Sequence, residues 1–394
     1  MESANSRVLG LGRANLKHTH AELKVVEDLG EVILKKEAVE AYLSGLFGRE
    51  VKVLGVGELG GEVKPFEDVK GFGYGKPFVI EFEVGGERKQ AVLSTVRPGQ
   101  FGHEYRSDRA AILLWQYEAF NKLPKHVKAL DVGAFTKDGR LKSLGDCGEF
   151  FLLTEKAEGV LYHVDLDRIL SEGKLTDLDR HRCLALADYL AEIHAVKRDE
   201  PGLYIRRVRD LVGHGECIMG LIDSYPPGLD YAPEALLKEI EHACVEWRWK
   251  LKKKTHRLSQ VHGDFHPWNV MFKPGTTDFM LLDRSRGDWG EPADDVTSMT
   301  VNYIFYALRA YGHLEGPFKE LFRSFWNRYL ARTGDEEILE VVQPFYAWRC
   351  LVIASPIWYP TLAKEVRVKL FNFVRNVLKT DVFDLGAVND YLEG

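Results

Sequence analysis

The sequence has few cysteines: five in 394 residues, no two of them in a CxxC pair. This spacing argues against a disulfide framework or a structural zinc site, and it is typical of a reducing compartment. A basic excess is missing too, since 53 lysines and arginines stand against 59 aspartates and glutamates, for a formal net charge of −6. The composition therefore gives no reason to expect nucleic acid or an anionic membrane as a partner.

Long apolar runs are also absent. No hydrophobic stretch approaches the roughly 18 residues that a transmembrane helix requires. The opening Met1-Glu2-Ser3-Ala4 lacks the basic-then-apolar order of a signal peptide. We therefore expect a soluble, cytoplasmic protein. With 45% hydrophobic and 28% charged residues, the chain has the composition of a globular protein long enough for two domains.

The first part of the chain shows strand patterns and glycine clusters. After a polar extension over residues 1–35, the spacing of apolar residues predicts a helix over 36–47. Glycine-rich stretches follow at 55–61 and at Gly71, Gly73 and Gly75, and Gly85-Gly86 predicts a tight turn. The expected strands are 51–56, 78–84, 90–96 and a pair around 127–135 and 149–154, with a helix at 108–123.

Beyond residue 165, the spacing of apolar residues becomes that of long amphipathic helices. A short β-like island at 260–282 interrupts them, with a turn at Lys273-Pro274-Gly275. The expected helices are 181–197, 236–254, 303–311, 318–331 and a long run from 335. The pattern predicts an α+β protein in which a small strand-rich lobe (36–156) precedes a larger, mainly helical lobe (157–394).

The most informative segment is 261–270, which reads Val-His-Gly-Asp-Phe-His-Pro-Trp-Asn-Val. Phosphoryl transfer from a nucleotide needs a carboxylate to orient and deprotonate the hydroxyl, together with oxygen ligands for magnesium. Asp264 and Asn269, five apart on a loop, can supply the base and one metal ligand. Asp283, at the end of an apolar strand, can supply an ionised second ligand.

These residues resemble the catalytic and metal-binding motifs of the aminoglycoside phosphotransferase and choline kinase family. The similarity rests on His262-Gly263-Asp264 with Asn269, on Asp283, and on Gly290-Glu291-Pro292 with Asp295. Residues 152–159 are similar to that family's inter-lobe hinge, and 186–194 to the helix that ends in a histidine after it. The resemblance covers most of residues 50–360, and it implies a two-lobed, protein-kinase-like fold with a nucleotide-covering loop in the small antiparallel-sheet lobe.

By this resemblance, Asp264 is the catalytic base, and Asn269 and Asp283 hold Mg²⁺. His262 and Asp295 would brace the catalytic loop. The implied cofactor is ATP (or GTP), and the implied partner is a small-molecule hydroxyl acceptor similar to an aminoglycoside, choline or a sugar. The carbonyl of Glu155 and the amide of Ala157 would pair with adenine, and Glu118 would be the conformation-setting glutamate of the helix after the third strand.

One position departs from the family pattern. Such kinases carry a lysine or arginine on the third strand to hold the α- and β-phosphates, but this sequence has Ser94 there. Arg97 lies an odd number of positions away, so in a regular strand it faces the opposite side. A bulge that turns Arg97 inward, or substitution by Lys76 or Lys89, would restore the cation.

Two other functions remain open from the residues. His262, Asp264 and His266 form an H-x-D-x-H pattern that would suit a zinc hydrolase, although no second histidine cluster follows. Ser94 motivates a catalytically weak or inactive nucleotide-binding module. A protein kinase is less favoured, because the 11 residues between Asp283 and Asp295 are too few for a docking loop.

The acceptor is not identified by the sequence. Aromatic and acidic residues of the helical lobe would suit a quaternary amine or an aminosugar, whereas Arg284 and Arg286 would favour an anionic or phosphorylated acceptor. The aromatic and acidic candidates are Trp289, Trp348, Trp358, Tyr359, Glu336 and Glu337. The oligomeric state is left open.

Overall fold

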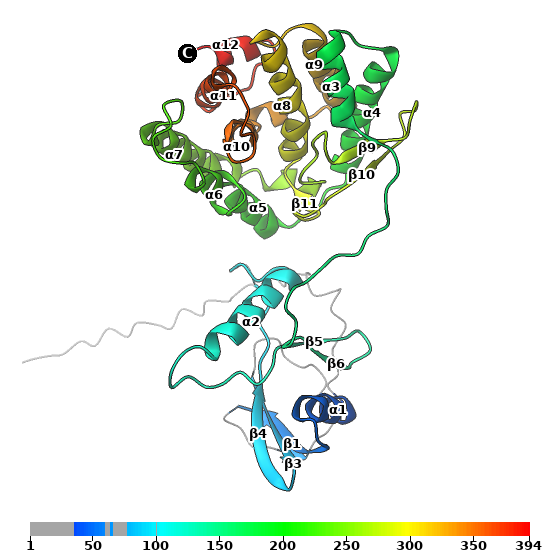
Figure 1. Ribbon diagram of the computed structural model, residues 1–394, viewed down its shortest axis with the longest axis vertical. Coiled ribbons are helices and arrows are strands. Elements are labelled where there is room, and N and C mark those ends of the chain that lie inside the picture. Colours follow the sequence, from blue (N-terminus) through cyan, green and yellow to red (C-terminus); the bar gives the residue numbers. More distant parts are fainter. Residues whose placement is uncertain (1–34, 60–63, 66–76, 100) are drawn as a thin grey trace, which may run out of the picture. The chain divides into compact units, whose positions relative to one another are not determined.

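A computed structural model describes residues 35–59, 64–65, 77–99 and 101–394 of the chain (Figure 1). The chain divides into two units: Met1–Gly99 with Tyr105–Phe150, and Gln100–Glu104 with Phe151–Gly394. Nearly all of the expected N-terminal extension lies outside the described residues. So do Gly60, Gly61, Lys76 and the second glycine cluster at Gly71, Gly73 and Gly75.

The first unit contains a four-stranded antiparallel sheet in the order β2-β1-β3-β4, covered by α1 (Lys36–Phe47). The strands are β1 (Val51–Glu58), β2 (Lys64–Pro65), β3 (Phe78–Val84) and β4 (Glu87–Leu93). Gly85 and Gly86, at φ 60° and 83°, form the tight turn between β3 and β4, as a two-residue hairpin with positive φ requires.

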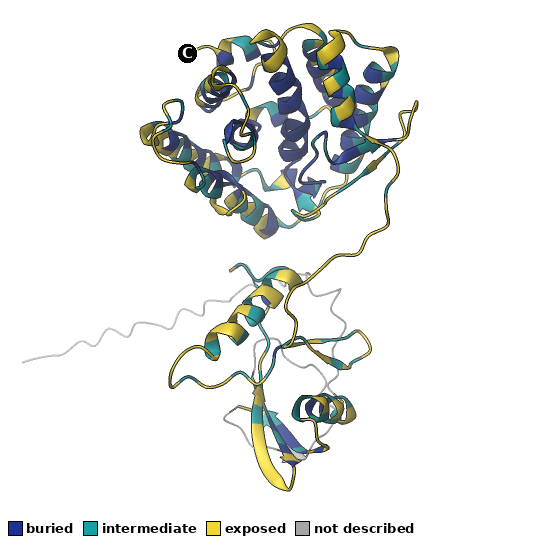
Figure 2. Ribbon diagram, in the orientation of Figure 1, coloured by how far each residue is buried: buried dark blue, intermediate teal, exposed yellow. Residues whose placement is uncertain are grey.

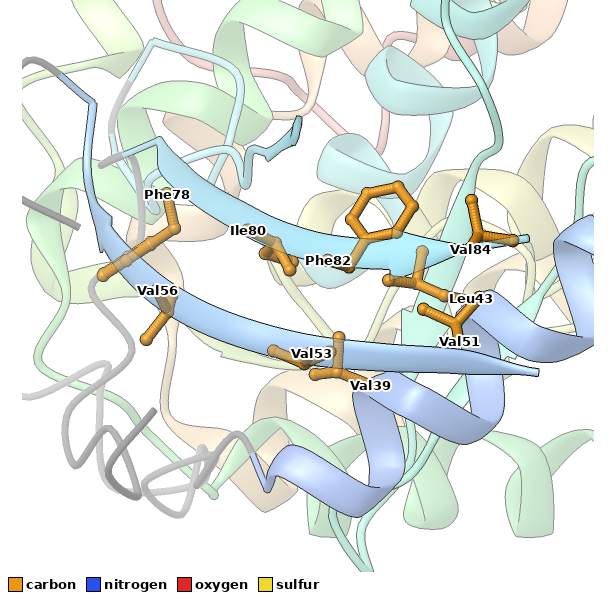
Figure 3. Close-up of a cluster of buried hydrophobic side chains, with 9 residues drawn as sticks. All are labelled: Val39, Leu43, Val51, Val53, Val56, Phe78, Ile80, Phe82 and Val84. Atoms are coloured by element: carbon orange, nitrogen blue, oxygen red, sulfur yellow. The ribbon is translucent and has the colours of Figure 1, made fainter. Parts of the chain in front are cut away.

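The core of this unit follows from strand alternation. Every second residue of β3, from Phe78 to Val84, is buried, and these side chains gather with residues of β1 and α1 (Figure 3). A bulge between Val53 and Gly55 shifts the register of β1, so that Val56 also turns inward. The cluster comprises Val39, Leu43, Val51, Val53, Val56, Phe78, Ile80, Phe82 and Val84.

Several expected boundaries in this unit are wrong. β4 ends at Leu93 and not at 96, and the next helix is α2 (Arg106–Phe120). The strand pair is β5 (Gly133–Phe135) with β6 (Leu141–Ser143), because the intervening turn closes locally, with the Thr136 amide bonded to the Arg140 carbonyl at 2.8 Å. Residues 149–154 contain no strand, and their apolar side chains at 151–153 are at least 88% exposed.

The second unit is mainly helical, and α8 (Pro292–Tyr311) is buried along most of its length (Figure 2). α8 packs against α9 (Gly316–Thr333) and α10 (Gln343–Ala354), while α9 also packs against α4 (Asp177–His194). The remaining helices are α3 (Tyr162–Glu172), α5 (Pro201–Gly213), α6 (Ile218–Asp223), α7 (Glu234–Leu251), α11 (Lys364–Val377) and α12 (Val388–Leu392), with 3-10 turns at Thr255–Arg257 and Glu336–Glu340.

Two helix predictions need correction here. The helix expected at 303–311 is the second half of the longer α8. The long helix expected from 335 is broken into a 3-10 turn and three helices, and Pro356 and Pro360 lie between α10 and α11, where proline cannot continue a helix. Among the described residues, no helix has both the length and the apolar character to cross a bilayer.

Two small β-structures hold the segment with the sequence motifs. β9 (Val270–Phe272) pairs with β10 (Phe279–Leu281) and with β7 (Val160–Leu161). β8 (Ser259–Gln260) pairs with β11 (Trp289–Gly290), immediately before α8. The loop from β8 to β9 and the segment from β10 to β11 are therefore fixed at both ends. The expected α+β class, with a small antiparallel-sheet unit and a larger helical unit, is confirmed.

Candidate active site

The loop between β8 and β9 is held by the first turn of α8. The two carboxylate oxygens of Asp295 accept the backbone N–H groups of His262 and Gly263, each at 2.7 Å. His194 Nε2 lies 3.2 Å from the same carboxylate, and His194 Nδ1 is 2.8 Å from the Tyr329 hydroxyl. Burial raises the pKa of Asp295, but the bonds and charges of the histidines outweigh it, so the net pKa is lowered and the carboxylate stays ionised.

The start of α8 is itself fixed by a buried carboxylate. Glu291 accepts bonds from both Nε and Nη2 of Arg257 and from the hydroxyl of Tyr204, at 2.7–3.0 Å. It also accepts the Ala293 amide as the helix N-cap, and Pro292 occupies the first turn, where its missing N–H costs nothing. The Gly290-Glu291-Pro292 motif therefore sets where Asp294 and Asp295 lie.

Gly263 is required by the geometry of the loop. Its φ is 87°, and a Cβ added there would lie 3.2 Å from Cβ of Arg286. A side chain would meet both an unfavourable backbone conformation and a close neighbour. Glycine thus allows the chain to bend immediately after the two amides that Asp295 holds.

His262 is a neutral, fully bonded imidazole. Its Nε2 lies 3.0 Å from the Leu282 carbonyl, which can only accept, so this nitrogen carries the proton. Its Nδ1 then accepts the Asp264 amide at 3.2 Å. Burial lowers the pKa of His262 and outweighs the neighbouring carboxylates, which agrees with the neutral form. Both ring nitrogens are occupied, which disfavours His262 as a zinc ligand.

Asp264 is held by basic side chains. Its Oδ1 accepts a bond from Arg349 Nη1 at 2.6 Å and lies 3.9 Å from Arg286 Nε, and its Oδ2 lies 3.5 Å from His266 Nε2. Burial raises the pKa of Asp264, but the bond from His266 and the charges of Arg349, His266 and Arg286 hold it well below its ordinary value. The carboxylate is ionised, with Oδ1 taken by Arg349 and Oδ2 without a short ion pair.

Arg349, on α10, is a residue of the candidate site that the sequence motifs missed. It is 6% exposed, and its Nη2 bonds to Asp294 Oδ1 at 2.5 Å and to the Gly263 carbonyl at 3.2 Å. Its guanidinium carbon also lies 3.8 Å from the ring centre of Trp348. An arginine within an apolar helix is a signal of a buried ion pair, but nothing local in the sequence identifies its partners.

Asn269 and Asp283 lie at neighbouring positions of one ribbon. The Leu282 amide donates to the Asn269 carbonyl at 2.9 Å, which extends the β9–β10 pairing to the residue before Asp283. The Asn269 side-chain amide donates to the Asp264 carbonyl at 3.0 Å, so its Oδ1 is available for another partner. Asp283 is exposed at φ 49°, an uncommon conformation that often marks functional positions.

A cavity of about 210 Å³ opens beside this ribbon. His262 and Asp283 contribute to its lining, with Tyr189, Ile193, Gln260, Val261, Leu281, Leu282 and Arg284. Within the described ranges, no group of three or more histidine, cysteine, aspartate or glutamate side chains is arranged to hold a metal ion. The oxygen atoms of Asn269 and Asp283 still match the donors that magnesium takes together with water and phosphate.

The other expected site residues lie outside the motif loop. Glu118 is on an exposed face of α2, with its carboxylate 3.8 Å from Lys122 Nζ. Ser94 and Arg97 are both exposed and follow the end of β4, so strand alternation does not decide where Arg97 points. Glu155 and Ala157 lie in the irregular segment before β7, Glu155 exposed and Ala157 half-buried.

Family comparisons agree with the motif geometry. The model of the phosphotransferase enzyme family (APH) matches residues 95–322, more than half of the chain. The protein belongs to this family, and the resemblance to aminoglycoside phosphotransferases and choline kinases is confirmed. A search among curated proteins gives no match.

Solved structures of kinases are similar at low identity. A glucosamine kinase in complex with glucosamine, ADP and inorganic phosphate is 18% identical, with 59% of this chain and 58% of that chain covered and a TM-score of 0.32. An ethanolamine kinase of Plasmodium vivax is 15% identical over 80% and 78% of the two chains, with a TM-score of 0.32. An aminoglycoside phosphotransferase of Streptomyces rimosus in complex with ADP and streptomycin is 17% identical over 48% and 67%, with a TM-score of 0.29. The chain thus spans less than two thirds of the glucosamine kinase structure.

Proposed function

We propose that this protein transfers the γ-phosphoryl group of ATP to a hydroxyl of a small molecule, in the cytoplasm. The observation that carries the proposal is the Asp264 carboxylate, anchored through Oδ1 by Arg349 on a loop that Asp295 fixes. In a chain of the phosphotransferase enzyme family, this arrangement leaves Oδ2, which has only the 3.5 Å contact with His266 Nε2, to receive a hydroxyl.

In the proposed reaction, the acceptor oxygen forms a bond to the γ-phosphorus while the bond from that phosphorus to the bridging oxygen of ADP breaks. The hydroxyl proton passes to Asp264 Oδ2, and ADP leaves. Because its pKa is strongly lowered, Asp264 is a weak base that acts mainly by orienting the hydroxyl. Such a base suffices when the transition state is loose and the proton leaves late.

Asn269 and Asp283 would hold Mg²⁺ through Asn269 Oδ1 and the Asp283 carboxylate. When bound, the ion would neutralise charge on the nucleotide phosphates. The Asn269 side chain keeps Oδ1 free by donating its amide to the loop carbonyl of Asp264. The donor chemistry of this pair fits magnesium, because both contribute oxygen.

The remaining nucleotide contacts are proposals carried by the sequence resemblance. The backbone of Glu155 and Ala157 would pair with adenine. Arg97 would supply the cation for the phosphates in place of a residue at Ser94, and Glu118 would set the active conformation. An inactive nucleotide-binding module remains the second candidate, because Ser94 leaves the family's phosphate-binding cation unfilled.

The test is transfer of labelled γ-phosphate to a panel of hydroxyl compounds, with products identified by mass spectrometry. Asp264→Asn should retain Mg·ATP binding and lower kcat by roughly 10²–10⁴-fold, because the group that orients the hydroxyl and accepts its proton is lost. Asp288→Asn is the matched control, since Asp288 is an exposed aspartate on the segment between β10 and β11. Unchanged turnover in Asp264→Asn would refute the assigned role.

A further inference from the structure

Two arginines, Arg349 and Arg286, lie beside both the Asp264 carboxylate and the Trp348 indole. The guanidinium carbons of Arg349 and Arg286 lie 3.8 Å and 4.6 Å from the ring centre of Trp348. Arg286 Nη1 also lies 3.9 Å from the sulfur of Cys217. Burial raises the pKa of the Cys217 thiol to about 12, and the charges of Arg286, Arg349 and Arg207 oppose this rise.

Arg349 uses both of its terminal nitrogens within the protein. Its two terminal nitrogens bond to Asp264 at 2.6 Å and to Asp294 at 2.5 Å. Burial raises the pKa of Asp294, and the charge of Arg349 opposes this. Arg349 thus neutralises the two buried carboxylates, and only its Nε lacks a hydrogen bond to a described residue.

Arg286 makes no carboxylate contact as short as those of Arg349. Its contact with Asp264 is 3.9 Å long, to the oxygen that Arg349 already binds, and its contact with Glu216 is 3.6 Å, to a side chain that is 68% exposed. Within the described part of the chain, Arg286 Nε is buried without a hydrogen bond. A buried N–H without an acceptor is costly in a folded protein, which favours a ligand at this position.

Arg284 shows what a structural arginine looks like in the same segment. Its Nε and Nη2 donate to the Val261 carbonyl at 3.1 Å and 2.7 Å, and Nη2 also reaches the Asp288 carbonyl at 3.3 Å. These bonds tie the segment after β10 to the motif loop. Arg286, two residues later, makes no comparable bond to a backbone carbonyl of the described chain, so a purely structural role does not account for it.

We infer that Arg286 binds an anionic group of the acceptor, a carboxylate or a phosphate, while the hydroxyl of the acceptor lies at Asp264. The inference rests on the proposed phosphotransferase function and narrows its substrate class. Guanidinium groups present paired N–H donors that match the oxygens of both anions. The Trp348 ring supports the Arg286 guanidinium. The positive charge of Arg286, which has no short ion pair, disfavours an amine next to the reacting hydroxyl.

The inference is tested by calorimetric titration of the full-length protein with four small hydroxyl compounds, in the presence of Mg·ADP. D-glycerate and glycerol 3-phosphate are the anionic probes, glycerol is the neutral match, and ethanolamine is the cationic one. At least one anion should bind more tightly than glycerol, and the probe that binds distinguishes carboxylate from phosphate. Arg286→Gln should weaken binding of that anion by about tenfold to hundredfold, the size of a charged hydrogen bond, with Mg·ADP affinity unchanged.

Arg323→Gln on the exposed face of α9 removes the same charge away from the site and should leave anion binding unchanged. The inference is overturned if neither anion binds more tightly than glycerol, or if ethanolamine binds best. It is also overturned if Arg286→Gln weakens Mg·ADP instead of the anion, since Arg286 would then serve the nucleotide. In each of these results Mg·ADP still binds the parent protein, whereas loss of all nucleotide binding would contradict the proposed function itself.

Discussion

Replacing Arg349 by glutamine removes the positive charge that Asp264 and Asp294 share. Asp264 and Asp294 are 9% and 6% exposed, so the variant leaves two buried carboxylates without their closest cation. Breaking a buried ion pair from one side costs about 3–5 kcal/mol. We expect the free energy of unfolding to fall by this amount at pH 7, where both carboxylates of the native protein need a partner.

Catalysis should suffer beyond the loss of stability. Without Arg349, Asp264 Oδ1 is no longer fixed, so kcat should fall even at a temperature where the variant is fully folded. Arg367→Gln is the matched control, because Arg367 is 3% exposed and donates to the carbonyls of Ala354 and Leu362 without touching a carboxylate of the loop. It should lose stability and keep kcat.

Denaturant unfolding and steady-state phosphoryl transfer measure the two effects separately. Adding Asp294→Asn to Arg349→Gln should recover part of the lost stability, because the buried charge is then removed with its partner. The reasoning is refuted if the free energy of unfolding of Arg349→Gln lies within about 1 kcal/mol of that of the parent, because an exposed ion pair contributes no more than this. It is also refuted if the kcat of Arg349→Gln equals that of Arg367→Gln.

Three further predictions concern metal, pH and thiols. Asp283→Asn should weaken Mg·ATP binding while ATP without metal binds as in the parent, and equal loss under both conditions would exclude a metal-ligand role. Burial raises the pKa of Glu337, but bonds from Lys254 and its other basic neighbours lower it from 4.5 to about 2. The ionised Glu337 therefore stabilises the fold fully above pH 4.5, and this stabilisation is lost as the pH falls to about 2. The difference in free energy of unfolding between the parent and Glu337→Gln should shrink over that range, and a constant difference would contradict the assignment. Cys147 is exposed and the other four cysteines are buried, so a thiol reagent should label one cysteine of five in the native protein and all five after unfolding; rapid labelling of more than one would contradict the burial.

Local sequence patterns predicted the parts of the fold that local interactions decide. The helix at Lys36–Phe47 has its expected bounds because apolar residues recur at helical spacing and Gly48 ends it at φ 62°. β3 follows strict alternation, and its bounds were also predicted. The strand expected at 149–154 failed because a run of apolar residues resembles a buried strand, whereas the turn between β5 and β6 pairs nearer neighbours.

In the candidate site too, the residues brought together by local interactions were predicted, and those brought together by helix packing were not. Asp264 and Asn269 are five positions apart on one loop, so the sequence itself brings them close together. Asp283 comes close to Asn269 because the neighbouring strands β9 and β10 pair. Arg349 comes from a helix 85 residues after Asp264, and its contacts depend on how α10 packs beside α8. No pattern in a single sequence specifies that packing, and the unused donors of Arg286 are visible only in three dimensions.

The central claim is tested most directly by titrating the full-length protein with ATP in the presence and absence of magnesium. The account predicts saturable binding that magnesium tightens, with affinity within the micromolar to millimolar range usual for enzyme substrates. Absence of detectable binding of ATP, and of GTP as the alternative nucleotide, at millimolar concentrations with magnesium present would contradict it.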